Sequence, residues 1–130
     1  TRQSLTVPMP TSTIEAGNIA ENLACEYLQQ QGLTLLTRNF RSRNGEIDLI
    51  MREGNTVVFV EVRARKQYNL VDSLHSVTAS KQNKIIKTAL YYLQTHSKLM
   101  DYPARFDVIA ITNRHAASDI NWIKDAFQTH

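Results

Sequence analysis

The sequence predicts an α/β domain in which a mixed sheet of four or five strands is flanked by helices, in the order αβββαβ. Three observations carry this prediction. Two segments have apolar residues at helical spacing, two Val- and Ile-rich segments are joined by a short turn, and another apolar strand follows the second helical segment. With 130 residues and 42% hydrophobic composition, the chain is long enough for one domain with its own core. We expect residues 1–11 to be a flexible leader and residues 12–130 to form that domain.

The first helix is expected to run from Ser12 to Gly32. Ser12 and Glu15 have the spacing of a capping box, and glycine commonly follows a helix C-terminus. The single cysteine, Cys25, lies inside this helix, so we expect a buried structural thiol in a reducing cytoplasm. Residues 33–40 follow as the first strand. The residues with apolar helical spacing are Ala20, Leu23, Ala24, Tyr27 and Leu28.

Segments 45–52 and 56–63 form a predicted β-hairpin, the second of them rich in Val and Phe. The turn residues, Gly54 and Asn55, favour a type II′ geometry because glycine comes first. A turn of this kind sets the register of the two strands. The opposed residues of the hairpin can therefore be read directly from the sequence.

In this register Asp48 lies opposite Glu61. Opposed side chains point to the same face of an antiparallel pair, with Cβ atoms about 4.5–5.5 Å apart, and like charges there destabilise a sheet. The two carboxylates therefore need a proton or a cation between them. A divalent metal ion with oxygen ligands meets this need. The alternative is a solvated face on which each carboxylate pairs with an arginine.

The neighbours of the acidic pair favour a site over a solvated face. Both sides of the hairpin are apolar, as in a sheet covered by helices. The same register places Glu46 opposite Arg63. The opposed apolar pairs are Ile50 with Phe59 on the face of the acidic pair, and Leu49 with Val60 and Ile47 with Val62 on the other face.

The second half of the chain predicts one more helix and one or two strands. We expect a loop over residues 67–76, a helix over 78–96, a strand over 105–111 and a short strand over 120–123. The helix is long enough to cross over the sheet and make the fourth strand parallel to the third. The predicted buried stripe of this helix comprises Ile85, Ile86, Ala89, Leu90 and Leu93.

Positive charge is concentrated around the hairpin, although the net charge is only +3. Residues 38–98 include 11 Lys or Arg against 5 Asp or Glu, whereas the rest of the chain is acidic overall. A basic field around an acidic centre suits a polyanion, and nucleic acid is the common one. No segment is apolar over the length of a membrane span, and no signal-peptide pattern opens the chain. We therefore expect a cytoplasmic protein without membrane contact.

Several motifs occur in an order that resembles a known family. The most specific are GEIDLI over residues 45–50 and VFVEVR over residues 58–63. This arrangement resembles the PD-(D/E)XK nuclease superfamily, which includes restriction endonucleases and archaeal Holliday junction resolvases. It resembles the YraN-like family of bacterial proteins still more closely, and it implies a restriction-endonuclease-like core. The other matching motifs, between residues 14 and 127, are Gly17-x-x-x-Glu21-x-x-Ala24-x-x-Tyr27-Leu28-x-x-x-Gly32, Asn39-Phe40-Arg41, Lys81-Gln82, Arg105-Phe106-Asp107-Val108 and Trp122-Ile123-x-x-Ala126-Phe127.

The resemblance implies a metal site at the acidic pair. Asp48 and Glu61 would bind Mg²⁺ or Mn²⁺, with the carbonyl of Val62 as a further ligand. Glu21 matches a helix glutamate that enters this site in junction resolvases; the alternative for Glu21 is an ordinary surface position. The candidate nucleic-acid-binding residues, which surround the hairpin or begin the second helix, are Arg41, Arg43, Arg65, Lys66, Lys81, Gln82 and Lys84.

Position 63 departs from the superfamily motif, which usually ends in lysine. Arginine stays charged and cannot act as a base, so Arg63 could orient the attacking water, stabilise the transition state or form a salt bridge with Glu46. The predicted function is metal-dependent hydrolysis of DNA phosphodiester bonds, with branched or single-stranded DNA among the candidate substrates. The alternative is a DNA-binding module that has the nuclease fold and little or no hydrolysis. The candidate catalytic residues are Asp48, Glu61, Arg63 and Glu46.

Overall fold

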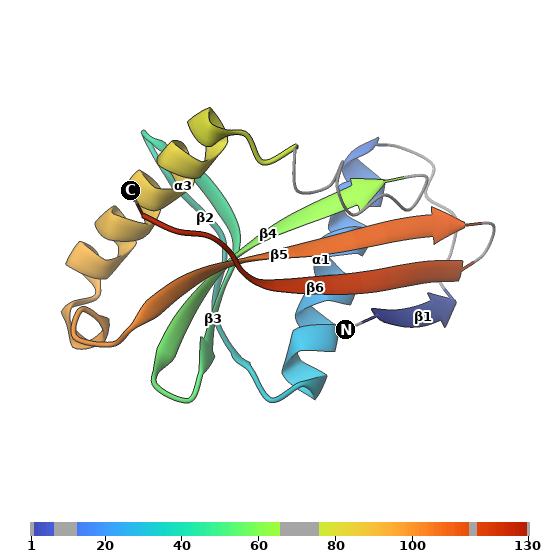
Figure 1. The fold of residues 1–130 in the computed structure, drawn as a ribbon, viewed down its shortest axis with the longest axis horizontal. Helices are drawn as coiled ribbons and strands as arrows, with labels where there is room; N and C mark the ends of the chain where they lie inside the picture. Colours follow the sequence, from blue (N-terminus) through green and yellow to red (C-terminus); the bar gives the residue numbers. More distant parts are fainter. Residues whose placement is uncertain (1, 7–12, 66–75, 115–116, 130) are drawn as a thin grey trace.

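The computed structural model describes residues 2–6, 13–65, 76–114 and 117–129, which form a six-stranded mixed sheet with a helix on each face (Figure 1). The strand order is β1-β6-β5-β4-β3-β2. The helices are α1 (Thr13–Gln30) and α3 (Ala79–Thr95), and a short 3₁₀ helix, η1 (Ser97–Leu99), follows α3. The strands are β1 (Arg2–Thr6), β2 (Thr34–Ser42), β3 (Gly45–Glu53), β4 (Thr56–Arg65), β5 (Ala104–Arg114) and β6 (Ala117–Phe127).

Helix α1 covers one face of the sheet and ends as the sequence predicts. The amide of Leu33 donates to the Leu28 carbonyl at 3.0 Å, and Gly32 between them has φ +99°, a conformation that glycine adopts without strain. Ser12, the predicted cap at the other end, lies outside the described residues. Cys25 is buried, as expected. The core on this face contains Ala20, Ala24, Tyr27 and Leu28 from the helix and Leu49, Met51, Val58, Val60, Ile109 and Ile111 from the sheet.

Helix α3 packs on the opposite face, over β2 and β3 (Figure 1). Its N-cap is Thr78, whose hydroxyl accepts the Lys81 amide at 3.3 Å. The predicted buried stripe is wrong at Leu90, which is 53% exposed, whereas Tyr92 is buried. The spacing i, i+3, i+4, i+7 from Ile85 explains the difference, because it selects Thr88, Ala89 and Tyr92. Thr88 can occupy this face because its hydroxyl donates to the Lys84 carbonyl at 2.8 Å.

The sheet topology agrees with the predicted class and adds strands at one edge. Strand β4 pairs in parallel with β5, as expected for a crossover through α3. Strand β6 is longer than the predicted 120–123 and pairs antiparallel with β5. Residues Arg2–Thr6 pair antiparallel with β6, where the sequence predicted a flexible leader. The predicted loop before α3 falls mostly on residues 66–75, which lie outside the described part of the chain.

The buried side chain of Asp107 links β5 to β6 by hydrogen bonds, at the end of the sheet that has the Gly54-Asn55 turn. Asp107 is fully buried, and its carboxylate accepts hydrogen bonds from the Arg105 guanidinium, at 3.0 Å, and the Trp122 indole, at 2.9 Å. The same carboxylate accepts the backbone amide of Asp125 at 2.9 Å. Arg105 in turn donates to Glu53 of β3 at 2.7 Å. Asp107 and Arg105 together therefore link β5 to β6 and to β3, at a point where the β5–β6 register shifts between Phe106 and Val108.

Candidate functional site

The predicted hairpin register is confirmed from the turn to Leu49. Leu49 pairs with Val60, and the pairs continue in the same register to Glu53 with Thr56. Gly54 has φ +58°, which a type II′ turn requires at its first position. The ladder stops before Asp48. There the Oδ2 atom of Asp48 accepts the backbone amide of Val62 at 2.8 Å, so a carboxylate takes the place of a backbone acceptor.

The alternation of side chains along β3 breaks at Asp48. Ile47 lies in the core beneath α3 together with Ile50, whereas Leu49 lies in the core beneath α1. The prediction that Ile47 shares a face with Leu49 is therefore wrong. The neighbouring strand is irregular at the same level, because Asn39, between the pairs Arg38–Leu49 and Phe40–Ile47, has φ +51°. Asparagine tolerates this left-handed conformation better than most residues.

The two carboxylates meet at this break in the ladder. Glu61 is mostly buried and hydrogen-bonds Asp48. The pKa of Glu61 is raised to about 9, chiefly by burial and then by the hydrogen bond and negative charge of Asp48, whereas the charges of Arg63 and Lys81 act in the opposite direction. At neutral pH without a cation, Glu61 therefore keeps its proton. A proton on Glu61 removes the repulsion between the two neighbouring carboxylates.

A third carboxylate, Glu21 of α1, approaches from the other face. Burial raises its pKa, the charge of Asp48 adds to this effect, and a hydrogen bond from Asn39 lowers it. The side chain is 17% exposed and lies 3.7 Å from the Arg38 guanidinium. Its Oε1 atom is buried and accepts no hydrogen bond from the described residues. The alternative of an ordinary surface glutamate is therefore wrong.

The residues present fit a hard cation bound by oxygen ligands. The donors are carboxylates, one of them holds a proton that a cation would displace, and Glu21 has an unsatisfied buried oxygen nearby. Among the described residues, no three His, Cys, Asp or Glu side chains are arranged to hold a metal ion. Asp48 and Glu61 would then provide the protein carboxylates, and Glu21 would act from farther away. Mg²⁺ sites commonly have this few carboxylates and complete their shell with water and substrate phosphate.

Arg63 and Glu46 do not pair as predicted. The Arg63 guanidinium donates to the Ser76 hydroxyl at 2.9 Å, just before α3. Glu46 forms its ion pair with Arg41 of β2 at 2.9 Å, because the β2–β3 ladder places these two residues opposite each other. The β3–β4 ladder has already ended at this level, so Glu46 and Arg63 are not a cross-strand pair. Arg63 remains beside Glu61, whose pKa its charge lowers.

The candidate nucleic-acid-binding residues have different surroundings. Lys81 and Lys84 are exposed on α3, and Arg43 is exposed in the turn between β2 and β3. Gln82 is less available, since its amide donates to the Val77 carbonyl at 3.0 Å and supports the start of the helix. Arg41 is highly exposed but paired with Glu46. Lys66 and the side chain of Arg65 lie outside the described part of the chain.

Three contributors to this site were missed from the sequence. Asn39 hydrogen-bonds Glu21, Arg38 pairs with it, and Ser76 holds Arg63. Asn39 belongs to a matching motif, and asparagine is a residue that tolerates positive φ, so a signal for it existed. Arg38 and Ser76 reach the site only through tertiary packing.

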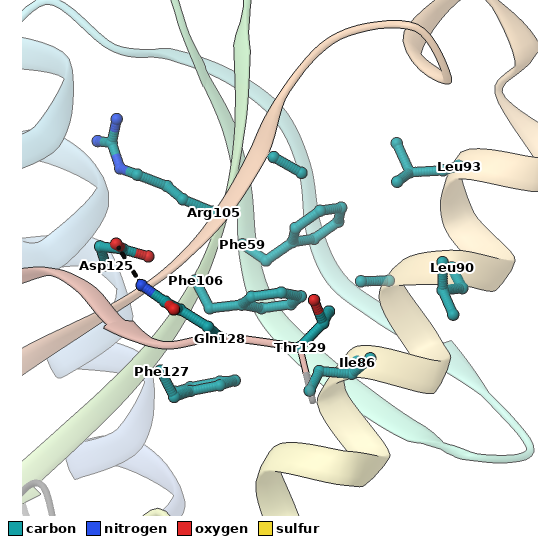
Figure 2. A pocket seen from close by; sticks show the side chains of 12 residues that line it. Phe59, Ile86, Leu90, Leu93, Arg105, Phe106, Asp125, Phe127, Gln128 and Thr129 are labelled. Atoms are coloured by element: carbon teal, nitrogen blue, oxygen red, sulfur yellow. Dashed lines mark hydrogen bonds between the residues drawn. The ribbon is translucent and has the colours of Figure 1, made fainter.

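A hollow elsewhere on the α3 face is lined by both apolar and polar side chains and lies apart from Asp48 and Glu61. It has a volume of about 490 Å³. Figure 2 shows Phe59, Phe106 and Phe127 opposite Ile86 and Leu90 of α3, and none of the acidic residues of the candidate site lines it. The exposed Leu90 side chain belongs to this hollow.

The fold and the acidic pair define a protein of the restriction-endonuclease-like class. Sequence comparison places the chain in a particular family of that class: residues 20–111 match the uncharacterised protein family UPF0102, and the chain belongs to it. Similar proteins include UPF0102 proteins of Stutzerimonas stutzeri, 48% identical over 88% of this chain and 95% of that protein, and of Coxiella burnetii, 47% identical over 89% and 94%. The UPF0102 protein of Nitrosomonas europaea is 50% identical over 85% of this chain and 92% of its own length. In the described part of the chain, no helix is both long and apolar enough to cross a bilayer.

Proposed function

We propose that this protein is a metal-dependent nuclease that hydrolyses phosphodiester bonds in DNA. The observation that carries the proposal is the contact between Asp48 and Glu61. The two carboxyl groups are hydrogen-bonded to each other, and Glu61 has a pKa of about 9. Such a pair favours a bound proton or cation over a state in which both groups are ionised and no cation is present. Structural ion pairs also perturb pKa values, but here burial and a second acid, Asp48, raise the pKa of Glu61.

The surrounding residues suit phosphodiester hydrolysis. A bound Mg²⁺ or Mn²⁺ would activate the attacking water and neutralise charge on the scissile phosphate. Arg63, held by Ser76 next to Glu61, would donate hydrogen bonds to a phosphate oxygen whose charge grows in the transition state. Arginine keeps its proton, so the proton lost by the attacking water would pass to a carboxylate or to solvent. Lys81, whose charge lowers the pKa of Glu61, would bind a neighbouring phosphate of the DNA backbone.

The decisive test is a cleavage assay with Mn²⁺ on single-stranded, duplex and branched DNA. The wild type is compared with Glu61→Gln, which keeps the shape of the protonated side chain but cannot bind a cation as a carboxylate. Glu53→Gln is the matched control, because Glu53 pairs with Arg105 and Lys124 and is not part of the acidic pair. We expect cleavage by the wild type and the control and none by Glu61→Gln. Equal cleavage by all three proteins would mean that the activity comes from elsewhere or from a contaminant.

A DNA-binding module without hydrolysis is the second candidate, and Arg63 is the residue that favours it. The usual lysine of the superfamily motif is replaced by a side chain that cannot be deprotonated. Binding of DNA by the wild type, with no cleavage in Mn²⁺ or Mg²⁺ of any of the three DNA forms, would establish this second function and exclude the first.

A further inference from the structure

Exposed cations follow one flank of α3 away from the acidic pair and end at an aromatic side chain. Lys81, Lys84 and Tyr91 are spaced so that they share this flank, with Lys87 at its outer edge. Lys81 is the strip residue nearest the site, because it lies in the first turn of α3 and Ser76, just before this helix, accepts a hydrogen bond from Arg63 at 2.9 Å. We call these four residues and Arg43 the α3 strip.

The turn between β2 and β3 brings Arg43 to the same flank. Gly45, which follows this turn, lies so close to α3 that a Cβ atom there would be 3.5 Å from the Cβ of Lys84 and 3.4 Å from the hydroxyl of Thr88. The Ser42 hydroxyl also donates to the Thr88 hydroxyl at 3.4 Å. The turn and the helix therefore form one continuous surface.

Within the described part of the chain, no acidic side chain neutralises the cations of the α3 strip by a salt bridge. None of Arg43, Lys84 and Lys87 forms an ion pair with another described residue, and Lys81 has only its longer-range interaction with Glu61. The described basic residues that do pair with a glutamate are Arg38, Arg41, Arg105 and Lys124. A polyanion could therefore bind the strip without displacing an existing salt bridge.

Tyr91 presents an aromatic face at the far end of the strip. Its side chain is 47% exposed and stacks on Phe40 of β2, with ring centroids 6.2 Å apart and planes 29° apart. Phe40 is held from below by the buried Tyr92 in an edge-to-face contact at 4.9 Å. Tyr91 is thus a braced, half-exposed ring about 15 Å along the helix axis from Lys81, given a rise of about 1.5 Å per residue.

We propose that the α3 strip binds a single-stranded segment of the DNA substrate, with phosphates on its cations and a base stacked on Tyr91. This inference rests on the proposed nuclease function. Unpaired cations combined with an exposed aromatic ring are the features by which proteins bind single strands. Bases in a duplex are stacked on each other and cannot also stack on a tyrosine. The segment bound on the strip leads at its Lys81 end to Asp48 and Glu61, so the strip selects substrates with an unpaired strand beside the scissile phosphate.

The test separates base stacking from backbone attraction. Binding is measured by fluorescence anisotropy in the presence of a chelator, which prevents cleavage, with three labelled DNAs: oligo(dT) of about 15 nucleotides, an abasic strand of equal length, and a duplex. We expect the wild type to prefer oligo(dT) over the abasic strand. Tyr91→Ala should weaken oligo(dT) binding about tenfold and leave the abasic strand and the duplex unaffected.

Two control variants test whether any loss of binding is due to the loss of the Tyr91 ring. Tyr91→Phe keeps the ring and should bind oligo(dT) as the wild type does. Leu90→Ala removes an exposed apolar side chain that lines the separate hollow, so its DNA binding should not change. Lys84→Glu, in contrast, should weaken binding of all three DNAs. It should also lower the log–log salt slope for oligo(dT) by about 0.7 for each phosphate that the variant no longer neutralises.

The outcomes distinguish the inference from the function on which it rests. Equal losses of affinity for oligo(dT) and the abasic strand in Tyr91→Ala would show that Tyr91 only supports the fold, and would overturn the stacking inference. A wild type that binds duplex but has no preference for oligo(dT) over the abasic strand would overturn it as well, while DNA binding itself would stand. A wild type that binds none of the three DNAs would overturn both proposals.

Discussion

Asp48 and Val62 are joined across the point where the β3–β4 ladder ends, by a hydrogen bond of 2.8 Å from the Val62 amide to the Asp48 carboxylate. Backbone pairing of β3 with β4 ends at Leu49, and beyond it the Asp48 side chain accepts the Val62 amide in place of a backbone carbonyl. One oxygen of the carboxylate is thereby held in place. Because Glu61 hydrogen-bonds the same side chain, the acidic pair is positioned by the backbone of β4. A local irregularity of the sheet therefore creates the candidate site.

Asp48→Asn should preserve the fold and abolish metal binding. An asparagine can turn its oxygen to the Val62 amide and its amino group to Glu61, so both hydrogen bonds can be kept. It cannot provide an anionic ligand. Mn²⁺ affinity, measured by calorimetry, should fall by more than the ~10–100-fold typical of losing a supporting partner of a metal ligand. Equal Mn²⁺ affinity in Asp48→Asn and the wild type would remove this carboxylate from the metal site.

The stability of the metal-free protein should fall as pH rises, because of Glu61. Its pKa is about 9 in the folded protein against an ordinary value of 4.5. Below about pH 4.5 both the folded and unfolded chains hold this proton, and the contribution of Glu61 to stability is fully present. As pH rises towards 9, only the unfolded chain releases the proton, so the free energy of unfolding falls by at most about 1.4 kcal/mol per pH unit until the contribution is lost.

Glu61→Gln should remove this dependence, since glutamine is neutral at every pH. Urea unfolding with a chelator present should find the variant more stable than the wild type at pH 8 and similar to it near pH 4. Adding Mn²⁺ should stabilise the wild type but not the variant, because the cation replaces the proton. Parallel pH profiles for the two proteins would mean that Glu61 has an ordinary pKa.

Arg63 should support catalysis through its positive charge and not by accepting a proton. Arg63→Lys should retain or increase the rate, because lysine matches the superfamily motif and keeps the positive charge. Arg63→Ala should lower it by about 10²-fold or more, which is typical of losing one transition-state donor. The measurement is the single-turnover cleavage rate with Mn²⁺. An unchanged cleavage rate in Arg63→Ala would mean that the Arg63 side chain only hydrogen-bonds Ser76 and takes no part in catalysis.

Asp107→Asn should destabilise the protein without acting on the acidic pair. The carboxylate is fully buried and accepts hydrogen bonds from Arg105, Trp122 and the Asp125 amide. In an asparagine, the side-chain amino group would face one or more of these hydrogen-bond donors and could not accept from them. The substitution would also leave the partly buried Arg105 guanidinium with Glu53 as its only charge partner among the described residues. The free energy of unfolding should fall by about 3–5 kcal/mol in urea. Asp101→Asn, at an exposed position, is the control and should have little effect.

Local features of the sequence determined the hairpin and the two amphipathic helices. The Gly54-Asn55 turn sets a register that holds through Leu49 with Val60, because turn geometry and side-chain alternation act over neighbouring residues. The sequence also brings Asp48 and Glu61 together, and their contact in the structure depends on that register. The parallel placement of β5 follows from the length of the crossover helix.

Tertiary structure alone decided how the acidic pair is surrounded. Ile47 changes face and Glu46 pairs with Arg41, because the β2–β3 ladder continues where the β3–β4 ladder has ended. Glu21 comes near Asp48 only when α1 packs on the sheet. Such contacts join residues that are distant along the chain, and no local pattern encodes them. The sequence therefore determined which carboxylates meet, and the packing of α1, β2 and the start of α3 decided which charges lie beside them.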